Sequence, residues 1–394
     1  MRIRPFTPDD AAGVAALWQY WFRTKTRDPD PGLVDLARHI YAEHPNRAEG
    51  ITSLVAEDDD GAMLGFLGVS VTPVSVDGEP ATLAGVFPSV IDPERASSAV
   101  ASLLLRRFLA GPQAFTFSDG GHEKFERIWE SLGGRIAQLQ SLRWVKLFRP
   151  ATVAVDAFTD GSRRPLRPVL RPLAAGGDWL ARRTVPQRLR SLPPRAAHER
   201  RPQARLLSEP LDAPAVVAVC EELHRGMRLR PRYDASYLQW LFTAMASIVG
   251  QGAFTARVVR DPAGGVAGWY VAYLRPGGVS RVFVLEAHPR FVEGVIDELF
   301  ARAEEAGVGA LIGRLGPRLR RPMVARGCLV YGGGSLQMLH ARDAGLVDAV
   351  ELGRVALSRL EGENWYWWAI VSERVPVLTG HADADAVGGT SDGS

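Results

Sequence analysis

The sequence has few of the features that mark specialised classes of protein. Its 394 residues include only two cysteines, Cys220 and Cys328, so a disulfide framework is not expected and both thiols are predicted to be small buried side chains. No apolar run reaches the roughly 18 residues that a membrane-spanning helix needs, and the polar N-terminus lacks a secretory segment. We therefore expect a cytoplasmic protein with no transmembrane segment.

Signatures of metal and nucleotide sites are also missing. There is no Cys-x-x-Cys or His-x-x-x-His spacing and the eight histidines are scattered, so no metal cofactor is expected. No Walker phosphate loop is present. One Gly-x-Ser-x-Gly match, residues 389–393, lies in a terminal segment, residues 380–394, that is poor in apolar side chains and is predicted to be disordered. It lacks the strand–turn–helix context of a catalytic serine, and we interpret it as chance.

What the sequence does contain is the composition of a folded protein, with 46% hydrophobic and 23% charged residues. A chain of this length is too long for one ordinary core, so two domains are predicted. Strand-like and helix-like periodicities alternate through both halves, which indicates an α/β fold with mixed sheets. We place an N-terminal domain at residues 1–150, a connector at 151–205 and a C-terminal domain at 206–372.

The two halves repeat one order of elements: helix, antiparallel strands, helix, strand, helix. The interval from the core of the central helix to the closing glycine is 29 residues in the first half (Leu104 to Gly133) and 28 in the second (Leu299 to Gly327), which supports a duplication. The N-terminal elements are expected as strands at 2–6, 51–57, 63–71, 74–76, 81–90, 115–117 and 136–148 and as helices at 97–110 and 123–132. The C-terminal ones are expected as strands at 254–260, 266–274, 279–285 and 310–315 and as helices at 213–223 and 291–306.

The most informative segment is the turn that follows the strand ending at Val90 and Ile91. Its small residues lead into an apolar helix, and the amides at a helix N-terminus, unpaired and at the positive end of the helix dipole, can hold a phosphate. The alternative is an ordinary helix N-terminus packed on a sheet. The candidate phosphate-binding residues of this turn are Ala96, Ser97, Ser98, Ala99, Val100 and Ala101.

This turn, in this order of elements, resembles the acyl-CoA-binding turn of the GNAT N-acyltransferases, whose pattern is Gln/Arg-x-x-Gly-x-Gly/Ala. The pattern falls without gaps on residues 96–101, where the small residues remain but the leading Arg or Gln and the first Gly are absent. Because Ala99 carries a Cβ where the family has glycine, it narrows the turn. A second signature, Leu-Tyr-Glu-x-x-Gly-Phe, corresponds to residues 128–134. Trp129 stands there in place of the usual general acid Tyr, and an indole N–H is too weak an acid for that role.

The resemblance implies two tandem GNAT-like domains, each a mixed, mostly antiparallel sheet flanked by helices. It also implies an acyltransferase that uses acetyl-CoA or another acyl-CoA as donor and an amine of a small molecule or sugar as acceptor. Backbone groups near Val90 would polarise the thioester carbonyl. Asp119 and His122, just after the central strand, are the candidates for relaying a proton from the amine. Alternatively, Ser118 or Asp119 caps the next helix and His122 is exposed.

Two further alternatives remain open. The connector is rich in arginine, and its prolines exclude one long helix, although a short amphipathic element could form around Trp179 and Leu180. Its charge could contact tRNA, as in an aminoacyl transferase resembling the Fem ligases, or could belong to a solvated linker. Residues 286–292, the second half's counterpart of the turn, have no small-residue cradle and are not expected to bind CoA in the usual way. A non-catalytic binding protein that keeps the fold is the third possibility.

The aromatic run at residues 364–368 is expected to form a strand. Alternation would place Trp365 and Trp367 on one face and Tyr366 and Trp368 on the other. Such side chains could stack on a sugar or a base, or could be buried against the second sheet.

Overall fold

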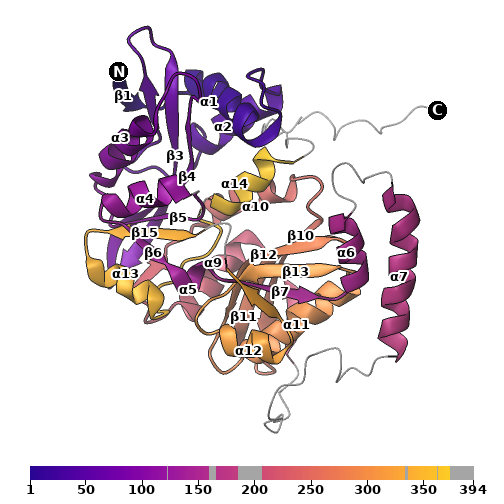
Figure 1. Ribbon diagram of the computed structural model, residues 1–394. Coiled ribbons are helices and arrows are strands. Elements are labelled where there is room, and N and C mark those ends of the chain that lie inside the picture. The colour runs from indigo at the N-terminus through magenta and orange to yellow at the C-terminus, as the bar shows by residue number, and fades with distance from the viewer. Residues whose placement is uncertain (122, 159–165, 185–205, 333–335, 362, 373–394) are drawn as a thin grey trace, which may run out of the picture.

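Two mixed sheets, each covered by helices, make up the protein (Figure 1). The computed structural model describes residues 1–121, 123–158, 166–184, 206–332, 336–361 and 363–372. His122, residues 185–205 of the connector and the terminal segment with its Gly-x-Ser-x-Gly match lie outside these residues. Within the described ranges, every helix is too short or too polar to cross a membrane.

The first sheet comes mainly from the N-terminal half. Its strands are β1 (Arg2–Pro5), β2 (Leu54–Glu57), β3 (Met63–Val76), β4 (Glu79–Ile91), β5 (Phe115–Ser118), β6 (Arg135–Ala137), β9 (Leu229–Pro231) and β15 (Gln337–Ala341). They lie in the order β1–β2–β3–β4–β5–β15–β6, with β9 also paired to β3. Of these pairs, β4 with β5 is parallel and the others are antiparallel.

The second sheet comes mainly from the C-terminal half. Its strands are β7 (Arg143–Leu147), β8 (Leu207–Pro210), β10 (Ala253–Arg260), β11 (Val266–Leu274), β12 (Val279–Ala287), β13 (Ala310–Arg314) and β14 (Leu329–Tyr331). They lie in the order β14–β7–β13–β12–β11–β10–β8, and here β12 with β13 is the parallel pair. The second sheet therefore repeats the strand order and directions of the first.

The repeat extends to the register of the central strands. The equivalent cross-strand triplets are Leu83–Phe115–Ala341 and Val279–Ala310–Leu147. A register shift also interrupts both sheets at the same place, between Leu67 and Val69 on β3 and between Val271 and Ala272 on β11. A shared register with a shared irregularity indicates duplication more strongly than the matching intervals in the sequence do, because a β-bulge is a specific local feature.

The two halves exchange one strand. β7 follows β6 in the chain but pairs with β13 and β14 in the second sheet, whereas β15 from the end of the second half pairs with β5 and β6 in the first. Figure 1 shows β7 among the orange strands of the second half and β15 beside the purple strands of the first. Neither sheet can be completed by its own half alone.

Helices cover both sheets and fill the space between them. They are α1 (Ala11–Trp18), α2 (Pro31–Tyr41), α3 (Ser98–Leu109), α4 (Glu123–Ser131), α5 (Gln138–Ser141), α6 (Pro150–Phe158), α7 (Arg167–Thr184), α9 (Ala213–Leu223), α10 (Ala235–Ala246), α11 (Val292–Glu305), α12 (Arg320–Ala325), α13 (Ala344–Glu351) and α14 (Glu363–Ile370), with a 3-10 turn η1 (Pro8–Asp10) and a π-helical turn η2 (Gln19–Arg23). One apolar core joins α1 and α2 of the first half to α9 and α10 of the second, with α14 between them.

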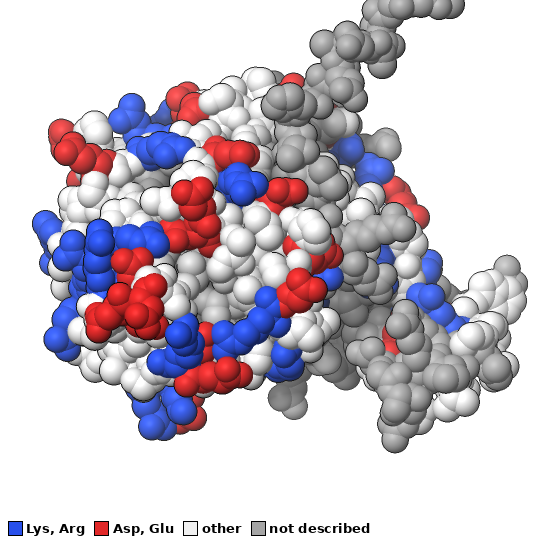
Figure 2. Space-filling model, turned by 90° about the horizontal axis from the view of Figure 1, so that it is seen from above, with Lys and Arg blue, Asp and Glu red and all other residues white. Residues whose placement is uncertain are grey.

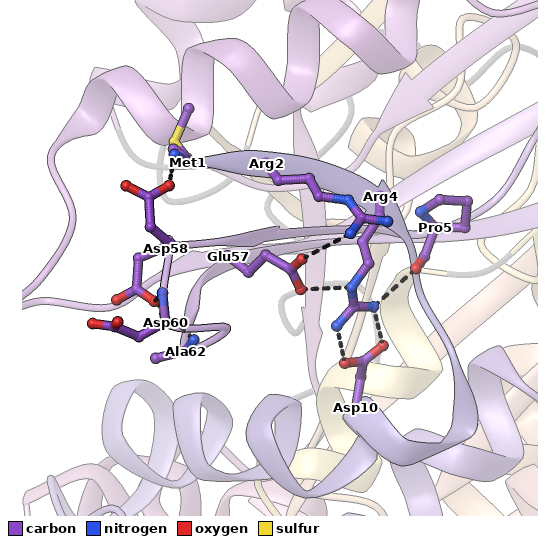
Figure 3. Close-up of polar contacts among 10 residues, drawn as sticks. Met1, Arg2, Arg4, Pro5, Asp10, Glu57, Asp58, Asp60 and Ala62 are labelled. Atoms are coloured by element: carbon purple, nitrogen blue, oxygen red, sulfur yellow. Dashed lines mark hydrogen bonds and ion pairs between the residues drawn. The ribbon is translucent and has the colours of Figure 1, made fainter.

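The first strand is an edge strand anchored by ion pairs (Figure 3). Arg4 on β1 donates from Nε to the carboxylate of Glu57 at 2.6 Å, and its two terminal nitrogens donate to Asp10 at 2.7 and 2.8 Å. Asp10 also accepts from the Thr7 amide and closes a capping box at η1. Arg4 thereby fixes the angle between the edge of the sheet and the entry to α1.

Three sequence predictions need correction. The strand expected at 136–148 is divided into β6, α5 and β7, because the chain crosses from one sheet to the other there. The aromatic run expected as a strand is the helix α14: Trp365 and Tyr366 are fully buried together with Ala369 and Ile370, which is helical spacing. In the connector, α7 runs for 18 residues through Pro172, longer than the short element expected.

Candidate functional site

The parallel pair at the centre of the first sheet separates toward its C-terminal end. β4 pairs with β5 from Leu83 to Gly85, yet β4 continues to Ile91. The bulge lies just beyond the last pair, at Phe87, whose carbonyl accepts a hydrogen bond from the Tyr41 hydroxyl at 2.7 Å. Val90, the residue predicted to lie beside a reacting carbonyl, therefore sits on the part of β4 that no longer pairs with β5.

The predicted phosphate-binding turn lies at the end of this strand and starts α3. Ser97 is the N-cap, and its Oγ accepts from the Ala99 amide at 3.4 Å. Ser97, Ser98 and Ala99 are exposed, whereas Val100 and Ala101 are buried beneath them. The turn thus presents Ser97 and Ser98 to solvent, while the buried Val100 and Ala101 pack the start of α3 against the core.

Asp92 organises the backbone of the turn from within. Its carboxylate accepts from the amides of Glu94 and Arg95, both at 2.9 Å, and pairs with Arg27 at 2.6 Å. The Arg27 guanidinium, helped by these amides and opposed by partial burial, lowers the pKa of Asp92 to about 2. Among the described residues, the amides of Ser97 and Ser98 have no such partner, so they remain available to an anion at the start of α3.

Asp119 occupies a different environment from the one the sequence suggested. It is buried at the end of β5, and its carboxylate forms ion pairs with Arg314 and, at 3.2 Å, with Arg359. The register makes Asp119 and Arg314 equivalent positions of the two halves, two residues beyond the last residues of β5 and β13 that pair with their parallel partners. The structure thus brings Asp119 to two guanidiniums of the second half, while its companion candidate, His122, lies outside the described residues.

The central strands of the second half separate in the same way. β12 pairs with β13 from Val279 to Arg281 and then continues alone to Ala287. A cavity of about 200 Å³ lies where they part, with apolar walls and a few polar side chains. Its lining includes Trp144, Leu223, His224, Met227, Gln140, Gln337, Val282, Val284, Glu286, Arg314, Leu315, Ser358 and Arg359.

An imidazole–carboxylate pair, with a buried His224 and a partly exposed Glu286, lies in this cavity. His224 Nε2 is 2.7 Å from Glu286 Oε2, which also accepts from the Trp269 indole at 2.9 Å. Burial by itself would lower the pKa of His224, but the charge and the hydrogen bond of Glu286, together with the charge of Glu361, outweigh it and the pKa is raised. Burial likewise opposes ionisation of Glu286, but His224 and Trp269 hold the pKa of Glu286 below its ordinary value. The pair is therefore built to keep the imidazole oriented and basic.

Apart from those of the ion-paired Arg314, two buried polar atoms in the lining have no hydrogen-bond partner among the described residues. They are Nδ1 of His224, a side chain 3% exposed, and Oε1 of Gln140, a residue 7% exposed. A buried polar atom without a partner costs free energy, so its presence at a cavity wall points to a ligand that completes it. Sequence reasoning missed this pair, because His224 and Glu286 are 62 residues apart and the segment 286–292 was considered only as the counterpart of the phosphate-binding turn.

Comparison with known proteins settles the fold. No family model and no curated protein matches the chain, but solved structures do. A conserved Enterococcus faecalis protein, named as a probable N-acyltransferase, is 11% identical with a TM-score of 0.53, and the match covers 90% of this chain and 73% of that one. The chain has the GNAT fold. A GCN5-related N-acetyltransferase from Anabaena variabilis gives 9% identity and a TM-score of 0.53 over 87% and 73% of the chains. A GCN5-related N-acetyltransferase from Kribbella flavida is 14% identical with a TM-score of 0.50, and the match covers 87% of this chain and 72% of that one.

The tandem GNAT fold explains the paired architecture of the site. Each half separates its central parallel strands just before a bulge, and each then turns into a helix, α3 or α11. Only the first turn has the small exposed residues predicted from the sequence; the second begins at Phe291, whose side chain makes no cap. Throughout the described ranges, no three His, Cys, Asp or Glu side chains are grouped to hold a metal ion.

Proposed function

We propose that the protein is an acyl-CoA-dependent N-acyltransferase, with acetyl-CoA as the first donor to consider and an amine of a small molecule or sugar as acceptor. The observation that carries the proposal is the separated end of β4, which passes the bulge at Phe87 and leads directly to the exposed N-terminus of α3. The GNAT fold, shared with solved structures that bear acyltransferase names, supports this assignment.

The donor would lie along β4 with its pyrophosphate at Ser97, Ser98 and Ala99. The amides of Ser97 and Ser98 and the positive end of α3 would bind the phosphate oxygens. Val90 and Ile91 would place the thioester beside the unpaired edge of β4, where backbone N–H groups can polarise its carbonyl. Ala96 begins the turn, while Val100 and Ala101 anchor it to the core.

His224 would activate the acceptor amine, which would reach the thioester on β4 from the second-half cavity, past Asp119, Arg314 and Arg359, where the two halves meet. Glu286 orients the imidazole through Nε2, which leaves Nδ1 to take a proton from an amine in the cavity. The amine nitrogen then bonds to the thioester carbonyl carbon, the carbon–sulfur bond breaks, and the CoA thiolate takes a proton from solvent. Trp129 does not supply it, since its indole N–H is buried and donates to the Leu339 carbonyl at 3.0 Å. Asp119 stays an alternative proton relay that a substitution can test.

Calorimetric titration with acetyl-CoA tests the donor site. We expect micromolar binding by the wild type, loss of binding by Ala99→Glu, which puts a carboxylate among the phosphate oxygens, and no change in Ala325→Glu. Ala325 is an exposed residue of α12 and receives the same added charge. Absence of binding to acetyl-CoA and to longer acyl-CoAs by the folded protein would refute the proposal.

A parallel titration with aminoacyl-tRNA distinguishes the two alternatives, a Fem-like transferase and a non-catalytic binding protein. Salt-dependent binding of aminoacyl-tRNA without CoA binding would favour a Fem-like transferase, and binding of neither would favour a non-catalytic protein. On the face shown in Figure 2, basic and acidic side chains are interspersed, and the net charge of the chain is only +3. No observation on the described residues therefore favours tRNA over CoA.

A further inference from the structure

A second and larger cavity, of about 750 Å³, lies far from the proposed donor turn. It opens between the tip of the β3–β4 hairpin, the end of α9, β9 and the start of α10. Its lining residues are Ser75, Gly78, Pro80, Val217, Cys220, Glu221, Arg225, Arg230, Pro231, Arg232, Tyr233 and Asp234. The hairpin tip and the donor turn are at opposite ends of β4, whose 13 residues span up to about 40 Å at roughly 3.3 Å per residue.

The pairing of β9 with β3 gathers polar side chains on one face of this cavity. Arg230 is directly opposite Ser75, and the Arg232 amide continues the ladder by donating to the Pro73 carbonyl at 2.8 Å. Residues directly opposite each other, and residues two apart on one strand, share a face of the sheet. Ser75, Arg230 and Arg232 therefore point to the same side, and Arg225 approaches from the end of α9.

These guanidiniums are not neutralised by the protein. Among the described residues, Arg225, Arg230 and Arg232 form no side-chain hydrogen bond or ion pair, whereas nearby Arg228 is paired with both Asp77 and Asp343.

Two acids also line the cavity, but they leave a positive excess. Asp234 is engaged as the N-cap of α10, where Oδ1 accepts from the Tyr237 amide at 2.8 Å, and Glu221 is exposed. The lining therefore carries three guanidiniums against two carboxylates, one of which is already engaged.

A buried hydroxyl adds an independent sign of a ligand. Ser75 is 4% exposed, and its Oγ has no hydrogen-bond partner among the described residues although it lines the cavity. A hydroxyl can donate to an anionic oxygen, and guanidiniums bind phosphate through paired N–H groups. The volume exceeds what a single phosphate needs and suits a nucleotide-sized molecule.

We propose that this cavity binds a phosphate-bearing small molecule of nucleotide size. Arg230, Arg232 and Arg225 hold its phosphate groups, and Ser75 donates a hydrogen bond to one of their oxygens. The site is separate from the proposed acyl-donor turn, and it lies where the hairpin of the first half meets α9 and α10 of the second. A bound polyanion there would tie the two halves together at the end opposite the donor.

Calorimetric titration of the full-length protein with pyrophosphate and with ADP tests the site. Losing one charged hydrogen-bond donor to phosphate weakens binding by about tenfold or more, so Arg230→Gln and Arg232→Gln should each have that effect on both probes. Ser75→Ala should weaken binding less, and Glu221→Gln should tighten it by removing a nearby negative charge. Arg320→Gln, at an exposed position on α12, is the matched control and should bind as the wild type does.

The Ala99→Glu variant separates this site from the donor turn. If Ala99→Glu still binds pyrophosphate and ADP, the proposal is supported, whether or not that variant binds acetyl-CoA. Three results overturn it: no binding of either probe at millimolar concentration, unchanged binding in both arginine variants, or binding that Ala99→Glu abolishes. Circular dichroism and thermal unfolding of each variant establish that the titrated protein is folded.

Discussion

The ion pair between Asp119 and the two arginines of the second half offers the sharpest test of how the halves depend on each other. The Asp119 side chain is 1% exposed, and those of Arg314 and Arg359 are 14% and 12% exposed. Asp119→Asn keeps the shape of the side chain but removes its charge, which leaves two nearly buried guanidiniums without that carboxylate. Removing one partner of a buried pair costs about 3–5 kcal/mol, mainly because the remaining charge stays desolvated.

We therefore expect Asp119→Asn to lower the free energy of unfolding by about 3–5 kcal/mol. At roughly 2 °C per kcal/mol for a protein at least this large, the melting temperature should fall by about 6–10 °C. The matched control is Asp348→Asn, which removes a carboxylate 2.6 Å from Arg135 in a pair that is about half exposed on both sides. Exposed pairs contribute about 0–1 kcal/mol, so this variant should melt within about 2 °C of the wild type.

Differential scanning calorimetry and urea unfolding measure the stability, and an acetyl-transfer assay on the same samples measures activity. The reasoning fails if Asp119→Asn melts like the wild type. If Asp119→Asn melts like the wild type and still binds acetyl-CoA but no longer transfers the acyl group, Asp119 acts as the proton relay that its place after the central strand first suggested. If it is destabilised but keeps its rate at a temperature where it is folded, the carboxylate is structural and His224 remains the candidate base.

Two further perturbations address the bulge and the pair of His224 and Glu286. Because the folded-state pKa of His224 is raised above 6.5 and that of Glu286 is lowered below 4.5, the pair stabilises the fold most between about pH 4.5 and 6.5. The contribution of His224 should be lost as the pH rises above 6.5 through its raised pKa, so a melting temperature that falls above pH 6.5 in the wild type should fall less in His224→Gln; identical profiles would contradict the assignment. Gly68→Ala should destabilise by about 1–3 kcal/mol, since its Cβ would meet the Tyr41 hydroxyl and lie 2.5 Å from the Phe87 carbonyl at the bulge. Urea unfolding compares it with Gly176→Ala, which meets nothing within 4 Å on α7, and a neutral Gly68→Ala would show that the bulge tolerates a side chain.

Local sequence patterns predicted the helices and strands well where a pattern is typical of only one kind of element, such as a helix cap or a closing glycine. The helix after the turn begins at Ser98 with Ser97 as its cap, and the next helix closes at Gly133, where φ is +88°. The aromatic run at 364–368 failed this condition, because a stretch with almost no polar residues shows neither a strand nor a helix period. Its burial among α1, α2 and α10 decides the helix, and no local signal reports those contacts.

The exchange of β7 and β15 lay beyond any reading of local pattern. Both strands are five residues long, and the register shows that they hold equivalent positions in the two sheets. The two strands differ in the strands they pair with. The path of the chain through α5 and α6, on either side of β7, sets the partners of β7. The dyad of His224 and Glu286 was hidden for the same reason, since it joins the end of a helix to a strand 62 residues later.

The exchange, the shared core and the Asp119–Arg314 pair have one physical consequence in common. In a duplicated protein whose halves folded independently, equivalent positions would carry similar side chains and face solvent. Here the equivalent positions at the ends of β5 and β13 carry opposite charges, a buried Asp119 and a largely buried Arg314, and form an ion pair across the interface. Burying either charge alone would be strongly unfavourable, so neither half can keep its residue without the other. The cavity that holds His224 is lined by Arg314 and Arg359, the same side chains that pair with the first half. Acyl transfer at such a site would therefore depend on the assembled pair of halves, and a fragment ending before β7 would lack β9 and β15 of the first sheet, every strand of the second sheet and the proposed base.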